Sequence, residues 1–415
     1  MKKKKIPTLP DDLVTKILLL LPVKSLLRSK SVCKSWRSLI SNPHFAKSHF
    51  DLAATEPTHR VLLCTKINSH SAIESLDLDA PLTDNSSVAR LNLKVPNFYS
   101  FDTLGSCRGF ILLADLENHV FIVWNPSTGV RVKIPLSVAF LYDPHSPTVT
   151  RNLISASFTT LIGKGIGYDE SRDDYLIVLM GLDKYSCLRI EAFSLKMNAS
   201  YCICGIGVGY DKLGRDDYNY SFGLFFNQSL HWLVMSKARQ VPVVLAFNLI
   251  DRRLSEILLP AESLALSPQF LNIMGGWLSL CFEGYDETKI WVMKEYNVHS
   301  SWTLYYHLAL ENTRYESCAP IWFTKGVNVL GSARGGLIKF NVEGELIERR
   351  ACRACDLKLM HYDIYRESLL SLPSYFAKDE EEAPTDEKSK QETVREPGRR
   401  SKKKISCHRR WTIEN

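Results

Sequence analysis

Apolar residues follow a helical period near the start of the chain. Between residues 13 and 21 they recur at i, i+4, i+7 and i+8, which places them along one face of a helix. Pro10 followed by Asp11 and Asp12 is typical of a first helical turn, where a missing N–H costs nothing and negative charge is favourable. Pro22 ends this helix. The stripe consists of Leu13, Ile17, Leu20 and Leu21, widened by Val14 and Leu18.

Two further helical patterns complete the first fifty residues. One covers residues 23–27, and the other covers residues 32–40 and ends where Asn42 and Pro43 break the chain. We therefore expect three short helices within residues 6–50. So small a segment cannot bury all of its Leu, Ile and Trp side chains by itself, and part of its apolar surface is left for a partner.

From about residue 60 to residue 372 the hydrophobic period falls to two. Short runs rich in Val, Ile, Leu, Phe, Tyr and Trp alternate there with turn residues. The run VFIVW at residues 120–124 has no polar position and predicts an inner strand buried on both faces. Groups of strands recur about every 50 to 60 residues, which is typical of a β-propeller of four-stranded blades. We expect about six blades, with five to seven open and two stacked β-sandwiches as the alternative.

These patterns divide the 415 residues into four parts. They are a basic extension at 1–5, the helical segment at 6–50, an all-β domain at 51–376 and a tail at 377–415. The tail combines high charge with almost no apolar side chains and is expected to be disordered. The rest has the composition of a folded protein, because hydrophobic residues make up 45% and charged residues 23% of the chain.

The formal net charge of +7 is carried mainly by the two ends of the chain. Residues 1–5 hold four lysines, and residues 377–415 hold eleven bases and nine acids, which leaves 37 bases and 36 acids for the body. A nucleic-acid-binding domain usually concentrates positive charge on itself. The charge balance of the body therefore argues against a nucleic-acid-binding domain in this region.

The cysteines and apolar runs indicate the compartment. Eleven scattered cysteines in a long chain favour free thiols over a disulfide framework. The run at residues 17–23 is flanked by acidic residues and is not followed by a small-residue cleavage site, so it does not resemble a secretory signal. No run reaches the roughly 18 apolar residues of a membrane span. We expect a cytoplasmic or nuclear protein with no membrane contact.

A search for catalytic or metal-binding patterns finds little. Cys352 and Cys355 form a lone CxxC without the second close pair that a structural zinc site needs. The Gly-rich runs at 163–167 and 205–209 lack a phosphate-binding order and are read as turns between strands. His231 is read as a satisfied sheet histidine. The neighbours Asp173 and Asp174 would point to opposite faces of a strand and are expected to be solvated at a turn. We expect no catalytic residue, metal or cofactor.

The segment Leu9–Phe50 resembles an F-box of the kind found in large plant families. The resemblance rests on the LP opening, the run ILLLLPVKSLLR, the run VCKSWRSLI and the closing NPHFAKSHF. The remainder, to about residue 372, is similar to the F-box-associated domain, through WNPSTG at Trp124, GIGYDESRDDYLIV at Gly165, SLHWL at Ser229, AFNL at Ala246 and WVMKEYNVHSSWTL at Trp291. That domain is similar to kelch-type propellers.

The resemblance implies a non-catalytic substrate receptor of an SCF-type ubiquitin ligase. The F-box would bind a Skp-family adaptor, which links to a cullin, and the β-domain would hold an unidentified target protein. Two positions depart from relatives, which often have an aromatic or aliphatic residue at Ser29 and Cys at Ser31, so adaptor affinity is expected to be reduced. The residues carried over for adaptor contact or domain packing are Leu9, Pro10, Ile17, Leu21, Pro22, Val23, Leu26, Leu27, Val32, Cys33, Trp36, Leu39 and Ile40.

Target-binding residues are expected in loops on one rim of the propeller. The polar stretches 142–157 and 210–221 are candidates, with Tyr218 and Tyr220 as aromatic anchors. A basic cluster in the tail is a candidate for nuclear import or RNA contact. A stand-alone protein-binding module and a nuclear RNA-binding module driven by the tail stay open as alternatives, and a copper oxidase would need a Tyr, His and Cys cluster that the sequence does not display. The basic cluster consists of Arg399, Arg400, Lys402, Lys403 and Lys404.

Overall fold

The structure is a computed structural model, which describes part of the chain. The described residues are 9–52, 58–67, 70–91, 93, 102–115, 119–135, 158, 160–206, 209–213, 222–260, 268–283, 287–309, 318–324, 328–333, 336–341, 343–351 and 361–373. Residues Met1–Asp379 form one compact unit, and the second unit, Glu380–Asn415, lies outside the described residues.

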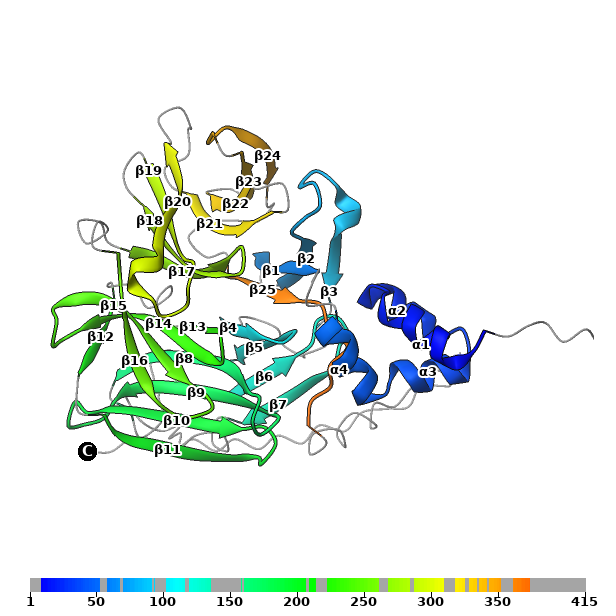
Figure 1. The fold of residues 1–415 in the computed structure, drawn as a ribbon, viewed down its shortest axis with the longest axis horizontal. Coiled ribbons are helices and arrows are strands. Elements are labelled where there is room, and N and C mark those ends of the chain that lie inside the picture. Colours follow the sequence, from blue (N-terminus) through cyan, green and yellow to red (C-terminus); the bar gives the residue numbers. More distant parts are fainter. Residues whose placement is uncertain are drawn as a thin grey trace, which may run out of the picture. The chain divides into compact units, whose positions relative to one another are not determined.

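Four helices lie at the start of the described chain (Figure 1). They are α1 (Asp11–Leu19), α2 (Val23–Ser29), α3 (Lys34–Ile40) and α4 (Pro43–Leu52). The sequence predicted three, and the fourth was missed because Asn42 and Pro43 were taken as the end of the helices. Asn42 instead accepts a hydrogen bond from the His44 N–H at 2.8 Å, as an N-cap residue does, and Pro43 takes the first helical position, where its missing N–H costs nothing.

The helices are followed by an all-β domain in a propeller-like arrangement (Figure 1). Four sheets among the described residues have the four antiparallel strands of a propeller blade. The first contains β25 (His361–Arg366), β1 (His59–Ile67), β2 (His70–Asp77) and β3 (Val88–Leu91). The second contains β4 (Asp102–Cys107), β5 (Phe110–Asp115), β6 (Val120–Trp124) and β7 (Arg131–Pro135).

Two more blades lie further along the chain. One contains β17 (Pro268–Met274), β18 (Trp277–Glu283), β19 (Glu287–Met293) and β20 (Trp302–Ala309). The other contains β21 (Cys318–Phe323), β22 (Val329–Ala333), β23 (Gly336–Phe340) and β24 (Leu346–Ala351). In the first blade the last strand, β25, pairs with β1 and so joins the end of the domain to its beginning.

The remaining sheet has nine strands. One half is β8 (Thr160–Asp169), β9 (Asp174–Leu182), β10 (Leu188–Ser194) and β11 (Ala199–Ile206). The other half is β13 (Phe222–Phe226), β14 (Ser229–Ser236), β15 (Val241–Asn248) and β16 (Leu254–Leu258), with β12 (Tyr210–Lys212) beside β14. The predicted count of about six blades is therefore not supported by the sheets, because β8 and β13 pair in parallel and join two strand groups.

Glycines allow this junction between β8 and β13. The run at residues 163–167, predicted to be a turn, lies inside β8. A Cβ atom on Gly165 would lie 3.0 Å from the Cα atom of Gly223, and one on Gly163 would lie 2.6 Å from the indole nitrogen of Trp232. The prediction was wrong because the glycines serve close strand packing rather than a turn.

The core consists of apolar clusters between neighbouring strand groups, not of the two layers of stacked sandwiches. Trp124 of β6 packs with Leu62 of β1, and Leu337 of β23 packs with Val61 of β1. β6 is buried along its last four residues, which confirms the prediction for VFIVW. The largest cluster also contains residues of all four helices, so helices and strands share one core.

Candidate functional site

Helix α1 carries apolar side chains on two faces. Leu13, Ile17 and Leu20 form an outer face and are 45%, 49% and 75% exposed. Leu13 and Leu20 were predicted to belong to one stripe with Ile17, but they were not included among the site residues. Their spacing of i, i+4 and i+7 was the signal that could have found them. The inner face, which packs into the core cluster, consists of Val14, Leu18 and Leu21.

The other helices fix the inner face of α1. His49 of α4 is buried, and its Nε2 atom lies 2.9 Å from the carbonyl oxygen of Leu21. Because a carbonyl oxygen only accepts, Nε2 carries the proton. Burial lowers the pKa of His49, which favours the neutral imidazole. Cys33 caps the start of helix α3, because its Sγ atom accepts a hydrogen bond from the Trp36 N–H at 3.4 Å.

The structure divides the thirteen residues predicted for adaptor contact or packing. Their role in adaptor binding stays a prediction, but their burial separates the two possibilities that the sequence left open. The exposed members are Leu9, Pro10, Ile17, Pro22, Val32 and Cys33. The partly buried members, which pack against the core cluster, are Leu21, Leu27, Trp36 and Leu39. The buried members are Val23, Leu26 and Ile40.

The two serines that depart from the resemblance are satisfied locally. The Ser29 hydroxyl donates to the carbonyl oxygen of Ser25 at 2.9 Å, and the Ser31 hydroxyl donates to that of Arg28 at 2.7 Å. Ser29 is partly buried, whereas Ser31 is exposed. Neither leaves an unpaired polar group in the helices, so any cost would arise from missing apolar contact with a partner.

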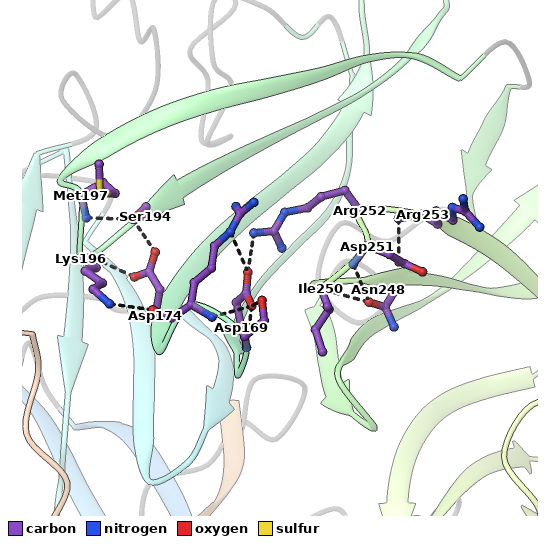
Figure 2. Close-up of polar contacts among 12 residues, drawn as sticks. Asp169, Asp174, Ser194, Lys196, Met197, Asn248, Ile250, Asp251, Arg252 and Arg253 are labelled. Carbon is purple, nitrogen blue, oxygen red and sulfur yellow. Dashed lines mark hydrogen bonds and ion pairs between the residues drawn. The ribbon is translucent and has the colours of Figure 1, made fainter.

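Two acidic residues of the run GIGYDESRDDYLIV, Asp169 at the end of β8 and Asp174 at the start of β9, border the turn between these strands (Figure 2). Arg252 donates to the buried carboxylate of Asp169 at 2.7 Å, which joins the turn after β8 to the turn after β15. Asp174 accepts from the Ser194 hydroxyl at 2.5 Å, and Asp173 accepts from the Tyr168 hydroxyl.

These partners test the prediction made for the adjacent pair Asp173 and Asp174. Their carboxylates have different partners, the Tyr168 hydroxyl for Asp173 and the Ser194 hydroxyl for Asp174. The expectation of solvation was wrong for Asp174, which is 4% exposed. Burial raises the pKa of its carboxyl group, while the hydrogen bonds from Ser194 and Lys196 oppose that rise.

His231 is a satisfied buried histidine, as predicted. Its Nδ1 atom lies 3.1 Å from the Leu224 carbonyl oxygen and its Nε2 atom 2.8 Å from the Tyr296 hydroxyl. Nδ1 therefore carries the proton and Nε2 accepts from Tyr296. Burial lowers the pKa of His231 to about 4, so the ring stays neutral at physiological pH.

Several predicted candidates lie outside the described residues. They are Cys352 and Cys355, the anchors Tyr218 and Tyr220, most of the stretch 210–221, all of the stretch 142–157, and the basic cluster Arg399, Arg400, Lys402, Lys403 and Lys404. Among the residues that are described, no group of three or more His, Cys, Asp or Glu side chains is placed to hold a metal ion. None of the described helices is long and apolar enough to cross a membrane.

Comparison with protein families identifies the class. The F-box domain matches residues 6–48, and the F-box associated beta propeller domain matches residues 56–329. Because the second match covers more than half of the chain, the chain belongs to the F-box proteins that carry this propeller domain. The kelch-like description of the domain stays a prediction.

Individual relatives agree with this family. F-box protein CPR1 of Arabidopsis thaliana is 29% identical over 322 residues, which cover 71% of this chain and 72% of that protein. F-box/kelch-repeat protein At3g23880 of the same species is 25% identical over 353 residues, covering 80% and 87%. A chain in the crystal structure of a nidogen/laminin complex is 12% identical with a TM-score of 0.41, covering 75% of this chain and 99% of that one, a likeness too low to support an argument.

Proposed function

We propose that this protein is the substrate-recognition subunit of an SCF-type ubiquitin ligase. In this proposal the F-box binds a Skp-family adaptor, the adaptor links to a cullin, and the propeller binds the protein to be ubiquitinated. The chain itself performs no reaction, as is general for F-box proteins. It acts by raising the local concentration of the target near the ubiquitin carrier.

The observation that carries the proposal is the outer face of α1. Leu13, Ile17 and Leu20 stay exposed although the same helix has a complete inner face in the core. Exposed apolar residues at helical spacing on a small domain are typical of a surface that a partner helix covers. The exposed Leu9 and Val32 extend the apolar character beyond α1.

Adaptor binding by the full chain tests this proposal. Isothermal titration with a panel of Skp-family adaptors would compare the wild type with the double variant Ile17→Ala and Leu20→Ala. Each truncation removes roughly 1 kcal/mol or more of buried apolar contact, so we expect about 30- to 100-fold weaker binding. The control is Met197→Ala with Ile250→Ala, two exposed apolar residues of the propeller that should leave the affinity within about twofold.

The outcomes of this titration separate the candidate functions. A wild type that binds no adaptor contradicts the ligase proposal and favours a stand-alone binding module. Equal binding by the wild type and the double variant would show that the adaptor does not bind the outer face of α1. In a separate RNA-binding assay, retention that depends on residues 377–415 would support the tail-driven alternative.

We further propose that targets bind at the rim where the chain passes from one strand group to the next. The strand ends that flank the two predicted stretches lie at this rim, because β8 begins there and β11 ends there. The turn after β9 lies beside both attachments, since Leu182 pairs with Thr160 and Leu188 pairs with Ile206. Tyr185, at the tip of this turn, is 74% exposed.

The turn that carries Tyr185 is preorganised. The Asp183 carboxylate accepts from the N–H groups of Tyr185 and Cys187, each at 2.9 Å. The Lys184 ammonium group lies 4.9 Å from the centre of the Tyr185 ring. An exposed tyrosine on a fixed turn loses little entropy on binding, which suits a contact residue.

A photocrosslinking amino acid at position 185 tests the rim. The matched control places it at Met197, which is 73% exposed on the turn after β10, at the opposite end of the same strands. We expect proteins crosslinked at 185 but not at 197 to accumulate when ubiquitin transfer is blocked. Equal crosslinking at both positions would contradict the assignment of the rim.

We also propose that the nine-stranded sheet represents two blades, which would make six in all. Each half is an antiparallel series of four strands, β8 to β11 and β13 to β16, and the halves meet through two residue pairs of β8 and β13. The cluster with Trp232 and Ile190 lies between the halves, as other clusters lie between separate blades. An experimental structure with six repeated four-stranded units would support this count.

For the compartment we propose the cytoplasm, the nucleus or both. Cys33, Cys107 and Cys187 are free thiols, which suits a reducing environment. Imaging of a fluorescent fusion, with and without alanine at the basic cluster 399–404, would test nuclear import. Retention in a secretory compartment would contradict this assignment.

A further inference from the structure

The last helix of the F-box is embedded in the propeller. Phe50 of α4 is 8% exposed and belongs to the apolar cluster that also contains Phe110 of β5 and Tyr168 of β8. The segment after β25 adds Leu369 and Leu370 to the same cluster. F-box helices, two strand groups and the end of the described chain therefore meet at one place.

Two arginines of the propeller lie over the Phe50 ring. The guanidinium carbon of Arg366, the last residue of β25, is 3.7 Å from the ring centre, and that of Arg108 is 4.7 Å from it. Arg366 Nη2 also donates to the Phe50 carbonyl oxygen, so it holds both the ring and the end of α4. Contacts of a cation with an aromatic face are strengthened by burial.

Both arginines are charged, and Arg108 has a second aromatic partner in the propeller. Arg108 also lies over the Tyr168 ring, at 4.1 Å from its centre. Burial, and secondarily the charge of Arg108, lower the pKa of Arg366 to about 10 against the opposing effect of Asp51. The guanidinium group therefore keeps its charge at neutral pH.

The segment after β25 is tied to a propeller turn. The buried side-chain amide of Asn125 donates to the carbonyl oxygens of Ser368 at 3.2 Å and Leu370 at 3.1 Å. Its side-chain oxygen accepts from the Ser127 N–H at 2.9 Å and so fixes the turn after β6. The same asparagine thus connects the blade of β4–β7 to the segment that packs under the helices.

We propose that Arg366 and Arg108 are positioning residues, which hold Phe50 and thereby keep the adaptor-binding face at one fixed orientation to the propeller. Arg366 ends β25, the strand that pairs with β1. The pairing that joins the end of the domain to its beginning and the contact with Phe50 therefore depend on the same strand. If the proposed ligase function holds, this junction sets which lysines of a bound protein come within reach of the ubiquitin carrier.

Distance measurements on the full chain test the junction directly. Spin labels carried by noncanonical amino acids at the exposed Lys16 and Met197 would report the spread of distances between F-box and propeller. We expect a narrow distribution for the wild type and for Phe50→Tyr, which keeps the ring. Arg366→Met, which keeps the stem and removes the guanidinium group, should widen it at least twofold. A distance distribution for Arg366→Met as narrow as that of the wild type, or a broad distribution for the wild type itself, would overturn the proposal.

Two further readouts separate positioning from a general loss of folding. Adaptor affinity of Arg366→Met should stay within twofold of the wild type, because the outer face of α1 is untouched. Mass spectrometry of a reconstituted ligase without target would show which lysines of the propeller carry ubiquitin. In the Arg366→Met variant, ubiquitin should be found on more of these lysines than in the wild type. If the same lysines are ubiquitinated although the distance distribution is wider, the junction does not determine which lysines are modified. If no chain is ubiquitinated, the result contradicts the ligase function. The distance measurement alone then decides whether Arg366 positions the F-box.

Discussion

The F-box and the propeller treat their apolar side chains in opposite ways. Of the fifteen large apolar side chains that are exposed among the described residues, six lie in the short segment 9–52. In the propeller, strands such as β5, β9 and β23 are buried at every position. The propeller encloses its core between successive strand groups, whereas four short helices leave one apolar face uncovered.

The difference shows where each region can bind. An apolar helical face favours a constant partner that covers it permanently or for long periods. The turns of the propeller are polar and fixed by side-chain caps, because Asn125, Asn248 and Asn341 each accept hydrogen bonds from N–H groups that follow them. Such turns can vary outside their caps without disturbing the strands, which suits the recognition of particular targets.

The largest effect should come from the buried side of the F-box. Leu26 is fully buried, and Leu26→Ala should lower the free energy of unfolding by about 3 kcal/mol and abolish adaptor binding through loss of the fold. Leu20→Ala, on the outer face, should change stability by less than about 0.5 kcal/mol. Urea unfolding of both variants measures this. Equal destabilisation would remove the distinction between the two faces of α1.

The next effect concerns the polar turns of the propeller. Arg252→Met leaves the buried carboxylate of Asp169 without its 2.7 Å partner, and we expect a loss of about 2 to 3 kcal/mol in unfolding free energy. The control is Arg253→Met at the exposed neighbouring position, which should have little effect. Thermal unfolding of the two variants checks the difference. Similar melting temperatures would mean that the ion pair does not hold these turns together.

The stability contributed by strand β25 should depend on pH. Burial raises the pKa of Asp363 in β25 to about 7, although hydrogen bonding with Ser106 and with the backbone of Ile364 and Gly105 opposes that rise. The folded protein therefore binds this proton more tightly than the unfolded chain, and its contribution to stability falls as pH rises from about 4 to 7.

This sign gives a test with Asp363→Asn, which cannot ionise. Relative to the variant, the wild type should lose about 2 to 3 kcal/mol of stability between pH 5 and pH 8. Paired denaturant titrations at the two pH values measure the difference. A constant difference between the two proteins would show that the carboxyl group does not titrate in this range.

The smallest effect concerns Ser29, one of the two positions that depart from the F-box resemblance. Ser29→Leu should raise adaptor affinity by about three- to tenfold, because it adds apolar contact at a partly buried position. Ser31→Ala, at an exposed position, should stay within about twofold. Surface plasmon resonance with an immobilised adaptor measures both. Weaker binding by Ser29→Leu would show that the site has no room for the larger side chain.

The sequence predicted the two regions because each has a strong period. The i, i+4, i+7 spacing of Leu13, Ile17 and Leu20 and the continuous apolar run of β6 both correspond to elements of the structure. The helix α4 was missed because a proline was taken as a breaker without weighing its place after a capping asparagine. Periodicity also could not divide the helical residues into packing and contact sets, since both faces of α1 are apolar.

Features that depend on tertiary contact were beyond the sequence. The parallel pairing of β8 with β13 requires glycines that are distant in the chain to meet, and a Gly-rich run by itself suggests a turn. The position of the Phe50 ring depends on contacts with Arg108 and Arg366, which are far from it in sequence. No local pattern marks either arginine as a partner of the F-box.

Hydrogen exchange of the full chain with and without a Skp-family adaptor tests the central claim most directly. We predict that adaptor slows exchange in α1 and at the start of α3, while the turn at residues 194–197 of the propeller is unchanged. That result would place the partner on the exposed apolar face of the F-box. Absence of protection in α1, or protection confined to the propeller, would contradict the account.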